Sequence, residues 1–105
     1  RPAGRPITLG MTLRIRAKAR RDLDDILDYS VAVHGEVAGE TYLLAIDTAL
    51  DRLRVHPELG MARPDLGDRI RSLPVREHRL FYRFDGKNIS IVRVLHKAMD
   101  PARHF

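Results

Sequence analysis

The spacing of apolar residues along this chain changes from a helical period to a strand period. In residues 19–27 apolar side chains recur at positions i, i+4, i+7 and i+8, and residues 42–53 also keep a helical spacing. Gly35 lies between the two runs and Pro57 follows the second. Because glycine and proline commonly end helices, we predict two helices joined by a short turn into an antiparallel hairpin. Acidic residues from Asp22 onward are expected early in the first helix, where they would suit the helix dipole.

Residues 56–68 have the composition of a loop, and beyond them apolar and polar residues alternate as in β-strands. The same alternation precedes the first helix. Asp85 and Gly86 predict a tight hairpin turn between the last two strands, and Pro74 indicates an edge or an end of its strand. The predicted strands are residues 12–16, 69–75, 79–84 and 89–95.

Apolar residues occupy both faces of the last predicted strand, which indicates a central strand covered on one side by the helices. The first strand is expected to pair beside it. The sequence therefore predicts an α+β fold of the order β-α-α-β-β-β, with the helical hairpin packed on one face of a mainly antiparallel four-stranded sheet and the other face partly open. The residues expected to face the sheet are Leu23, Ile26, Ile46, Leu50 and Leu53.

At 105 residues the chain fits one domain. Residues 1–10 hold two prolines and two glycines without apolar periodicity, so we interpret them as a flexible N-terminal arm or a cloning remnant, with Met11 as a natural start. Residues 11–105 then form the domain. The chain has no cysteine, and no apolar run approaches the ~20 residues that span a bilayer. We expect a cytoplasmic protein without a membrane partner.

Charge is distributed unevenly around the formal net value of +5. Residues 1–21 carry +7, residues 22–68 carry −8, and residues 69–105 carry +6. A protein that coats nucleic acid uniformly would not concentrate acid in this way. Any surface that faces a polyanion must therefore belong to the two basic segments.

Motifs of the common enzyme classes are absent from the sequence. The five histidines are too scattered for a metal-binding spacing, and neither a phosphate-binding glycine loop nor a serine-hydrolase elbow occurs. We expect no metal and no cofactor. The acid pairs Asp24–Asp25 and Asp47–Asp51 are interpreted as parts of solvated helix faces.

Basic side chains on the predicted sheet are the strongest candidates for function. Arg79, Arg83 and Arg93 lie on neighbouring strands, and His96 with Lys97 follows the last strand. These side chains would converge near the open sheet face, where arginine suits a phosphate or an acidic protein surface. The alternative is that they are edge charges that prevent aggregation between strands.

Several segments resemble the ParE toxins of the RelE/ParE superfamily. They are residues 71–83, residues 89–100 after the Asp85–Gly86 turn, and the helix-ending residues 56–60, which match the Pro-x-x-Gly turn of that family. Residues 19–29 resemble the first helix of the family. The similarity runs from Thr12 to about Asp100, so it covers nearly the whole domain.

The resemblance implies the toxin of a type II toxin-antitoxin system, which inhibits DNA gyrase and is neutralised by a ParD-type antitoxin in a heteromeric complex. It implies no sequence-specific DNA binding by the toxin alone. The alternative within the superfamily is a RelE-like or YoeB-like endoribonuclease that cuts messenger RNA in the ribosome. A third reading is a non-toxic protein-binding module, which growth arrest on expression without a partner would exclude.

The same resemblance suggests roles for individual residues. As a ribonuclease, the protein would use Arg79 to stabilise a phosphorane-like transition state and His96 as a general acid. The chain ends in a ParE-like manner, however, and lacks the aromatic residue that nuclease members place near the C-terminal catalytic position. Antitoxin contacts are expected at Tyr29, Val33 and Phe81. Target contacts are expected at Arg79, Arg83, Arg93, His96, Lys97, Met99 and Asp100.

Overall fold

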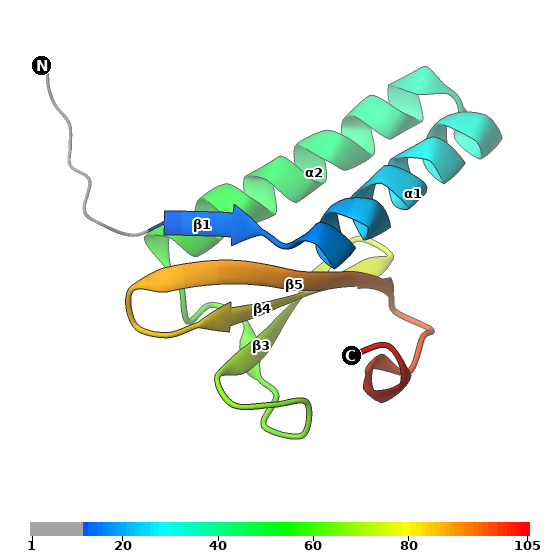
Figure 1. Cartoon of the computed structure of the whole chain (residues 1–105). Helices are drawn as coiled ribbons and strands as arrows, with labels where there is room; N and C mark the ends of the chain where they lie inside the picture. The colour runs from blue at the N-terminus through cyan, green and yellow to red at the C-terminus, as the bar shows by residue number, and fades with distance from the viewer. Residues whose placement is uncertain (1–11) are drawn as a thin grey trace, which may run out of the picture.

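The computed structural model describes residues 12–105 as two helices laid across a sheet (Figure 1). The predicted arm and Met11 lie outside these residues. Among residues 12–105 no helix is both long and apolar enough to cross a membrane. The elements are β1 (Thr12–Ile15), α1 (Ala17–His34), α2 (Glu36–Val55), β2 (Met61–Ala62), β3 (Ile70–Val75), β4 (His78–Phe84), β5 (Asn88–His96) and the 3₁₀-helix η1 (Pro101–Arg103).

The sheet has the order β1-β5-β4-β3-β2. β1 pairs with β5 in parallel, and all other neighbours are antiparallel, which confirms the predicted meander and the predicted place of the first strand. The predicted number of four strands was one too low. β2 is only two residues long and lies in a segment with loop composition, so it gives no alternating pattern. Because β2 pairs only with Arg71 and Ser72, β3 is an edge strand at Pro74, as predicted.

A β-bulge interrupts the pairing of β4 with β5. Phe81 pairs with Arg93 and Tyr82 pairs with Ile91, so Val92 has no partner in β4. Alternation along β5 therefore changes phase at Val92. This explains why both faces of this strand looked apolar in the sequence.

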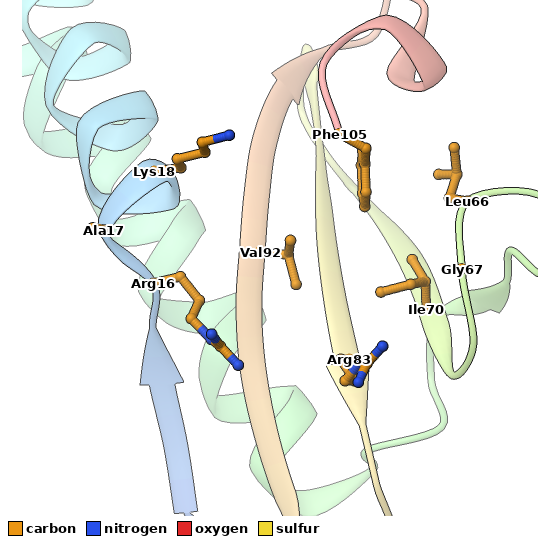
Figure 2. Close-up of a pocket in the computed structure, with 9 residues that line it drawn as sticks. All are labelled: Arg16, Ala17, Lys18, Leu66, Gly67, Ile70, Arg83, Val92 and Phe105. Carbon is orange, nitrogen blue, oxygen red and sulfur yellow. The ribbon is translucent and has the colours of Figure 1, made fainter.

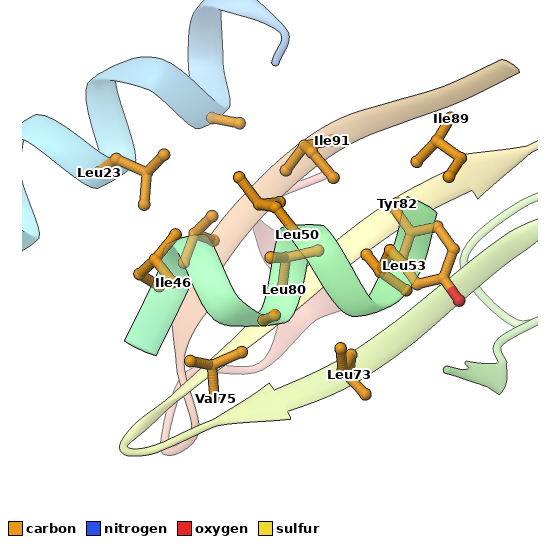
Figure 3. Packing of buried hydrophobic residues seen from close by; sticks show 13 residues of the cluster. Leu23, Ile46, Leu50, Leu53, Leu73, Val75, Leu80, Tyr82, Ile89 and Ile91 are labelled. Atoms are coloured by element: carbon orange, nitrogen blue, oxygen red, sulfur yellow. The ribbon is translucent and has the colours of Figure 1, made fainter. Parts of the chain in front are cut away.

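The helical hairpin buries its apolar stripe against one face of the sheet, as predicted (Figures 1 and 3). Ile46 and Leu53 of α2 are almost fully buried against Leu80 and Tyr82 of β4. Leu23 and Leu50 are also buried, and Ile26 packs partly buried against the same cluster. We call this face of the sheet the helix face, and the opposite one the open face.

The predicted turn between the two helices is confirmed at Gly35. Gly35 ends α1 with a φ of +93°, a conformation that favours glycine, and α2 begins at the next residue. The prediction that acidic residues lie in the first turn of α1 was wrong. The helix begins at Ala17, earlier than its apolar pattern, and its first turn contains no acidic residue.

Candidate functional site

A cluster of aromatic and histidine side chains lies on the helix face, at the end of β5. His78 and His96 are direct cross-strand partners with ring centroids 5.3 Å apart, and the His78 ring stands edge-on to Tyr42 at 5.4 Å. The Tyr42 hydroxyl hydrogen-bonds His78 Nδ1 and accepts the Glu77 N–H at 3.2 Å. These side chains, with Tyr29 of α1, border an apolar pocket of about 160 Å³. Sequence reasoning did not find this cluster, because its members are scattered along the chain.

Burial shifts the pKa values of two side chains in this cluster. Burial lowers the pKa of His78 below the ordinary histidine value, and the neighbouring His96 lowers this pKa further. Burial also raises the pKa of Tyr42 above its ordinary value. His78 is therefore held in its neutral form, with Tyr42 as its hydrogen-bond partner. Among the described residues, no three histidine or acidic side chains come close enough together to hold a metal ion.

The structure places Arg79 and His96 on opposite faces of the sheet. Side chains alternate along β4, so Arg79 points away from the face that carries His78 and Leu80. Arg79 borders a shallow pocket on the open face with Met61 and Ser72, whereas His96 borders the histidine pocket on the helix face. The two residues of the ribonuclease hypothesis are not brought together.

Two of the predicted target-binding residues are engaged within the fold. Arg93 makes an ion pair with Asp22 at 2.8 Å and donates to the His104 carbonyl oxygen, and both charged side chains of the pair are largely buried. Lys97 forms an exposed ion pair with Glu77 at 2.8 Å.

The remaining members of that set lie near the surface. Met99 is 40% exposed, and the Asp100 carboxylate caps η1 by accepting the Ala102 N–H at 3.1 Å. Arg83 borders a larger hollow on the open face. The predicted target residues thus fall into separate groups and do not form one patch.

The expected antitoxin contacts differ in their exposure. Tyr29 and Val33 lie one turn apart on α1 and are 66% and 52% exposed. Phe81, in contrast, is 1% exposed, so it does not belong to a free surface with them. The Phe105 ring packs edge-on against it at 5.3 Å, and the Arg63 guanidinium lies over its face. No pattern in the sequence predicts that residues after β5 fold back over Phe81.

Further apolar side chains enlarge the exposed surface of the hairpin. Val37 and Leu44 of α2 are 76% and 65% exposed. The sequence pattern does not predict either as functional, because both lie outside the core stripe. Exposed apolar patches on protein surfaces commonly mark binding sites.

Comparison with known proteins gives consistent matches. The family model described as the ParE toxin of the type II toxin-antitoxin system parDE matches residues 13–101. The chain is 36% identical over 88 residues to Toxin ParE1 of Mycobacterium tuberculosis, covering 83% of this chain and 90% of that protein. It is 31% identical over 92 residues to Toxin ParE1 of Caulobacter vibrioides, covering 88% and 95%.

Solved structures agree with these matches. A chain of the chromosomal ParDE system from P. aeruginosa superposes with a TM-score of 0.70 at 27% identity, covering 83% of this chain and 96% of that one. A chain of the toxin-antitoxin complex RelBE2 from Mycobacterium tuberculosis gives 0.58 at 25% identity, covering 85% and 100%. The β-α-α-β-β-β core is therefore shared with toxins of both branches.

Proposed function

The chain belongs to the ParE toxin family of type II toxin-antitoxin systems, and from this premise we propose that it inhibits DNA gyrase and is neutralised by a ParD-type antitoxin. The observation that carries the choice of inhibitor over ribonuclease is the separation of Arg79 and His96 on the two faces of the sheet. Proton transfer requires an acid or base within hydrogen-bond reach of the reacting group. Among residues 12–105, no histidine, tyrosine or acidic side chain borders the pocket beside Arg79.

The segment after β5 supplies the target contact that we propose. Lys97 is paired with Glu77 and Asp100 caps η1, so both side chains shape the segment. Met99 and Phe105 are the large exposed apolar side chains of this segment, and Met99 lies closer to β5 along the chain. A flexible thioether side chain is a suitable anchor for a pocket on another protein. The same segment carries Phe105 on Phe81, so removing it whole would also uncover the open face.

Supercoiling by purified gyrase tests this proposal. We expect the protein to block supercoiling or to trap cleaved DNA, and Met99→Ala to weaken the block about tenfold. Met61→Ala is the matched control, because Met61 is 72% exposed on β2 and lies outside the C-terminal segment. Full supercoiling in the presence of excess wild-type protein would contradict the proposal.

The antitoxin is proposed to cover the exposed side of the helical hairpin. Tyr29 borders the pocket of about 160 Å³ at the histidine cluster, which is below the ~300 Å³ of typical small-molecule sites and suits a single apolar side chain. Val33 extends the apolar surface along α1. A disordered antitoxin segment that folds on binding would bury this surface. The ParDE and RelBE2 structures named above are themselves toxin-antitoxin systems, which supports a partner of this kind.

Copurification with the product of an adjacent antitoxin gene tests the antitoxin surface. We expect a stable complex, a rise in melting temperature, and relief of growth arrest. Val33→Asp should weaken the complex at least tenfold, because it places a charge in an apolar contact. Val55→Asp, at the other end of the hairpin and 70% exposed, is the matched control. Equal effects of the two substitutions would place the antitoxin elsewhere.

A further inference from the structure

A groove of about 500 Å³ on the open face is lined by three basic side chains (Figure 2). Arg16 and Lys18, where β1 passes into α1, form one side, and Arg83 of β4 lies across from them. Val92, the bulged residue of β5, lies on the floor between the two sides. The remaining lining residues are Ala17, Leu66, Gly67, Ile70 and Phe105.

The three cations of the groove have no anionic partner within the part of the chain that the structure describes. Among residues 12–105, no ion pair and no side-chain hydrogen bond involves Arg16, Lys18 or Arg83. Two other arginines are compensated, since Arg93 pairs with Asp22 and Arg63 pairs with Asp65. The groove therefore holds positive charge that the fold itself does not use.

A row of side chains across the sheet extends this positive surface. Ser90 of β5 pairs with Arg14 of β1 on one side and with Arg83 of β4 on the other. Leu13 and Ile15 pack against the core, so Arg14 points to the open face with Arg83. Two guanidinium groups thus flank a hydroxyl group, an arrangement that suits phosphate oxygens.

The positive surface continues along β4 to Arg79. Arg79 lies on the same face as Arg83 four residues away, which is about 13 Å along a strand. The arginines of this surface come from the two basic segments of the sequence, which β1, β5 and β4 bring side by side. A row of arginines along a strand favours a polymer with regularly repeating negative charges.

We propose that this groove binds single-stranded nucleic acid without sequence preference. The arginines would hold the phosphodiester backbone, and an unpaired base would lie on the apolar floor against Phe105, a residue that is 42% exposed. A duplex presents its backbone and would leave Val92 and Phe105 without apolar contact. An acidic peptide would also satisfy the cations, but repeating phosphates match the extended row of arginines better.

Fluorescence anisotropy with labelled oligonucleotides tests the groove without gyrase or antitoxin, so the inference does not rest on the proposed function. The probes are single-stranded oligo(dT) and oligo(U) of about 12 nucleotides and a duplex of the same length. We expect both single strands to bind more tightly than the duplex at low salt. Tighter binding of oligo(dT) or of oligo(U) would identify DNA or RNA as the ligand, and either result supports the proposal.

A charge-matched pair of variants separates the groove from net charge. Arg16→Ala/Arg83→Ala should weaken binding about tenfold or more and make the salt dependence less steep by about 0.7 per lost phosphate contact. Arg52→Ala/Arg54→Ala removes the same charge from the exposed surface of α2 and should change binding less than about twofold. Equal losses in both double variants, tighter binding of the duplex, or displacement of the oligonucleotide by a lower concentration of polyglutamate would each overturn the proposal.

Discussion

The carboxylate of Asp22 in α1 accepts two hydrogen bonds from the guanidinium of Arg93 in β5, at 2.8 and 2.9 Å. It also accepts the Val94 N–H at 2.9 Å. The ion pair raises the pKa of Arg93 above its ordinary value. β1 ends at Ile15, so it does not cover the edge of β5 further along the strand. There the Asp22 carboxylate binds the backbone of β5 and so joins the first helix to the bulged strand.

Arg93→Ala should lower the free energy of unfolding by about 2–4 kcal/mol, because it leaves a largely buried carboxylate without its charged partner. Urea denaturation followed by circular dichroism measures the change. Arg83→Ala is the control on the neighbouring strand and should stay within about 0.5 kcal/mol of the wild type. A comparable loss of unfolding free energy in both variants would contradict a specific stabilising contribution of the Asp22–Arg93 ion pair.

Tyr82 connects the sheet to the turn that follows α2. Its hydroxyl donates to the Pro57 carbonyl oxygen at 2.7 Å and accepts the Gly60 N–H at 2.8 Å, while the whole residue is buried. Tyr82→Phe should cost about 2–4 kcal/mol of unfolding free energy, because the buried Gly60 N–H and the partly buried Pro57 carbonyl lose their partner. Thermal denaturation would show it, and a melting temperature equal to that of the wild type would contradict it.

Gly60 should be equally sensitive for a steric reason. A Cβ at this position would lie 2.8 Å from the Ser72 carbonyl oxygen and from the Tyr82 ring. The Pro-x-x-Gly turn noted in the sequence thus has a physical basis in Tyr82, which lies more than twenty residues further along the chain. The sequence contains the glycine, but only the fold identifies what crowds it.

The bulge at Val92 marks the limit of what the sequence predicts about the candidate site. With unbroken alternation, His96 would lie on the same face as Ser90 and therefore near Arg79. One inserted residue moves Val94 and His96 to the helix face and Arg93 to the open face. The helices, four of the five strands and the core stripe follow from local periodicity, whereas the bulge depends on pairing between strands.

The packing of α2 against the helix face predicts which of its leucines stabilise the fold. Leu50 is 6% exposed within the core cluster, so Leu50→Ala should lower the free energy of unfolding by about 2–5 kcal/mol. Leu44→Ala on the same helix removes the same atoms from a side chain that is 65% exposed. It should change stability by less than about 0.5 kcal/mol. Urea denaturation of the two variants measures both changes. A larger loss in Leu44→Ala than in Leu50→Ala would show that the side of α2 that carries Leu50 does not face the sheet.

His78 should make stability depend on pH. Burial and His96 lower its pKa in the folded state, while Glu77 and Asp22 act in the opposite direction. Its contribution to stability is therefore complete above the unfolded-state pKa of about 6.5 and is lost as the pH falls toward the lower folded-state pKa. We expect the urea midpoint to drop as the pH falls below about 6.5, with a smaller slope in His78→Gln. Parallel slopes for the two proteins would exclude His78 as the source.

Double substitution of Arg79 and His96 distinguishes the inhibitor from the ribonuclease. In a catalytic pair either substitution alone abolishes cleavage, and the second adds little. Because the two side chains lie on opposite faces of the sheet, we expect Arg79→Ala and His96→Ala to change gyrase inhibition independently, with free-energy effects that add to within about 0.5 kcal/mol in the double variant. We also expect no cleavage of messenger RNA when the wild-type protein is added to translating ribosomes. Codon-positioned cuts that disappear in Arg79→Ala would instead establish the ribonuclease. The acid or base for cleavage would then come from a group that does not lie on the open face of this chain.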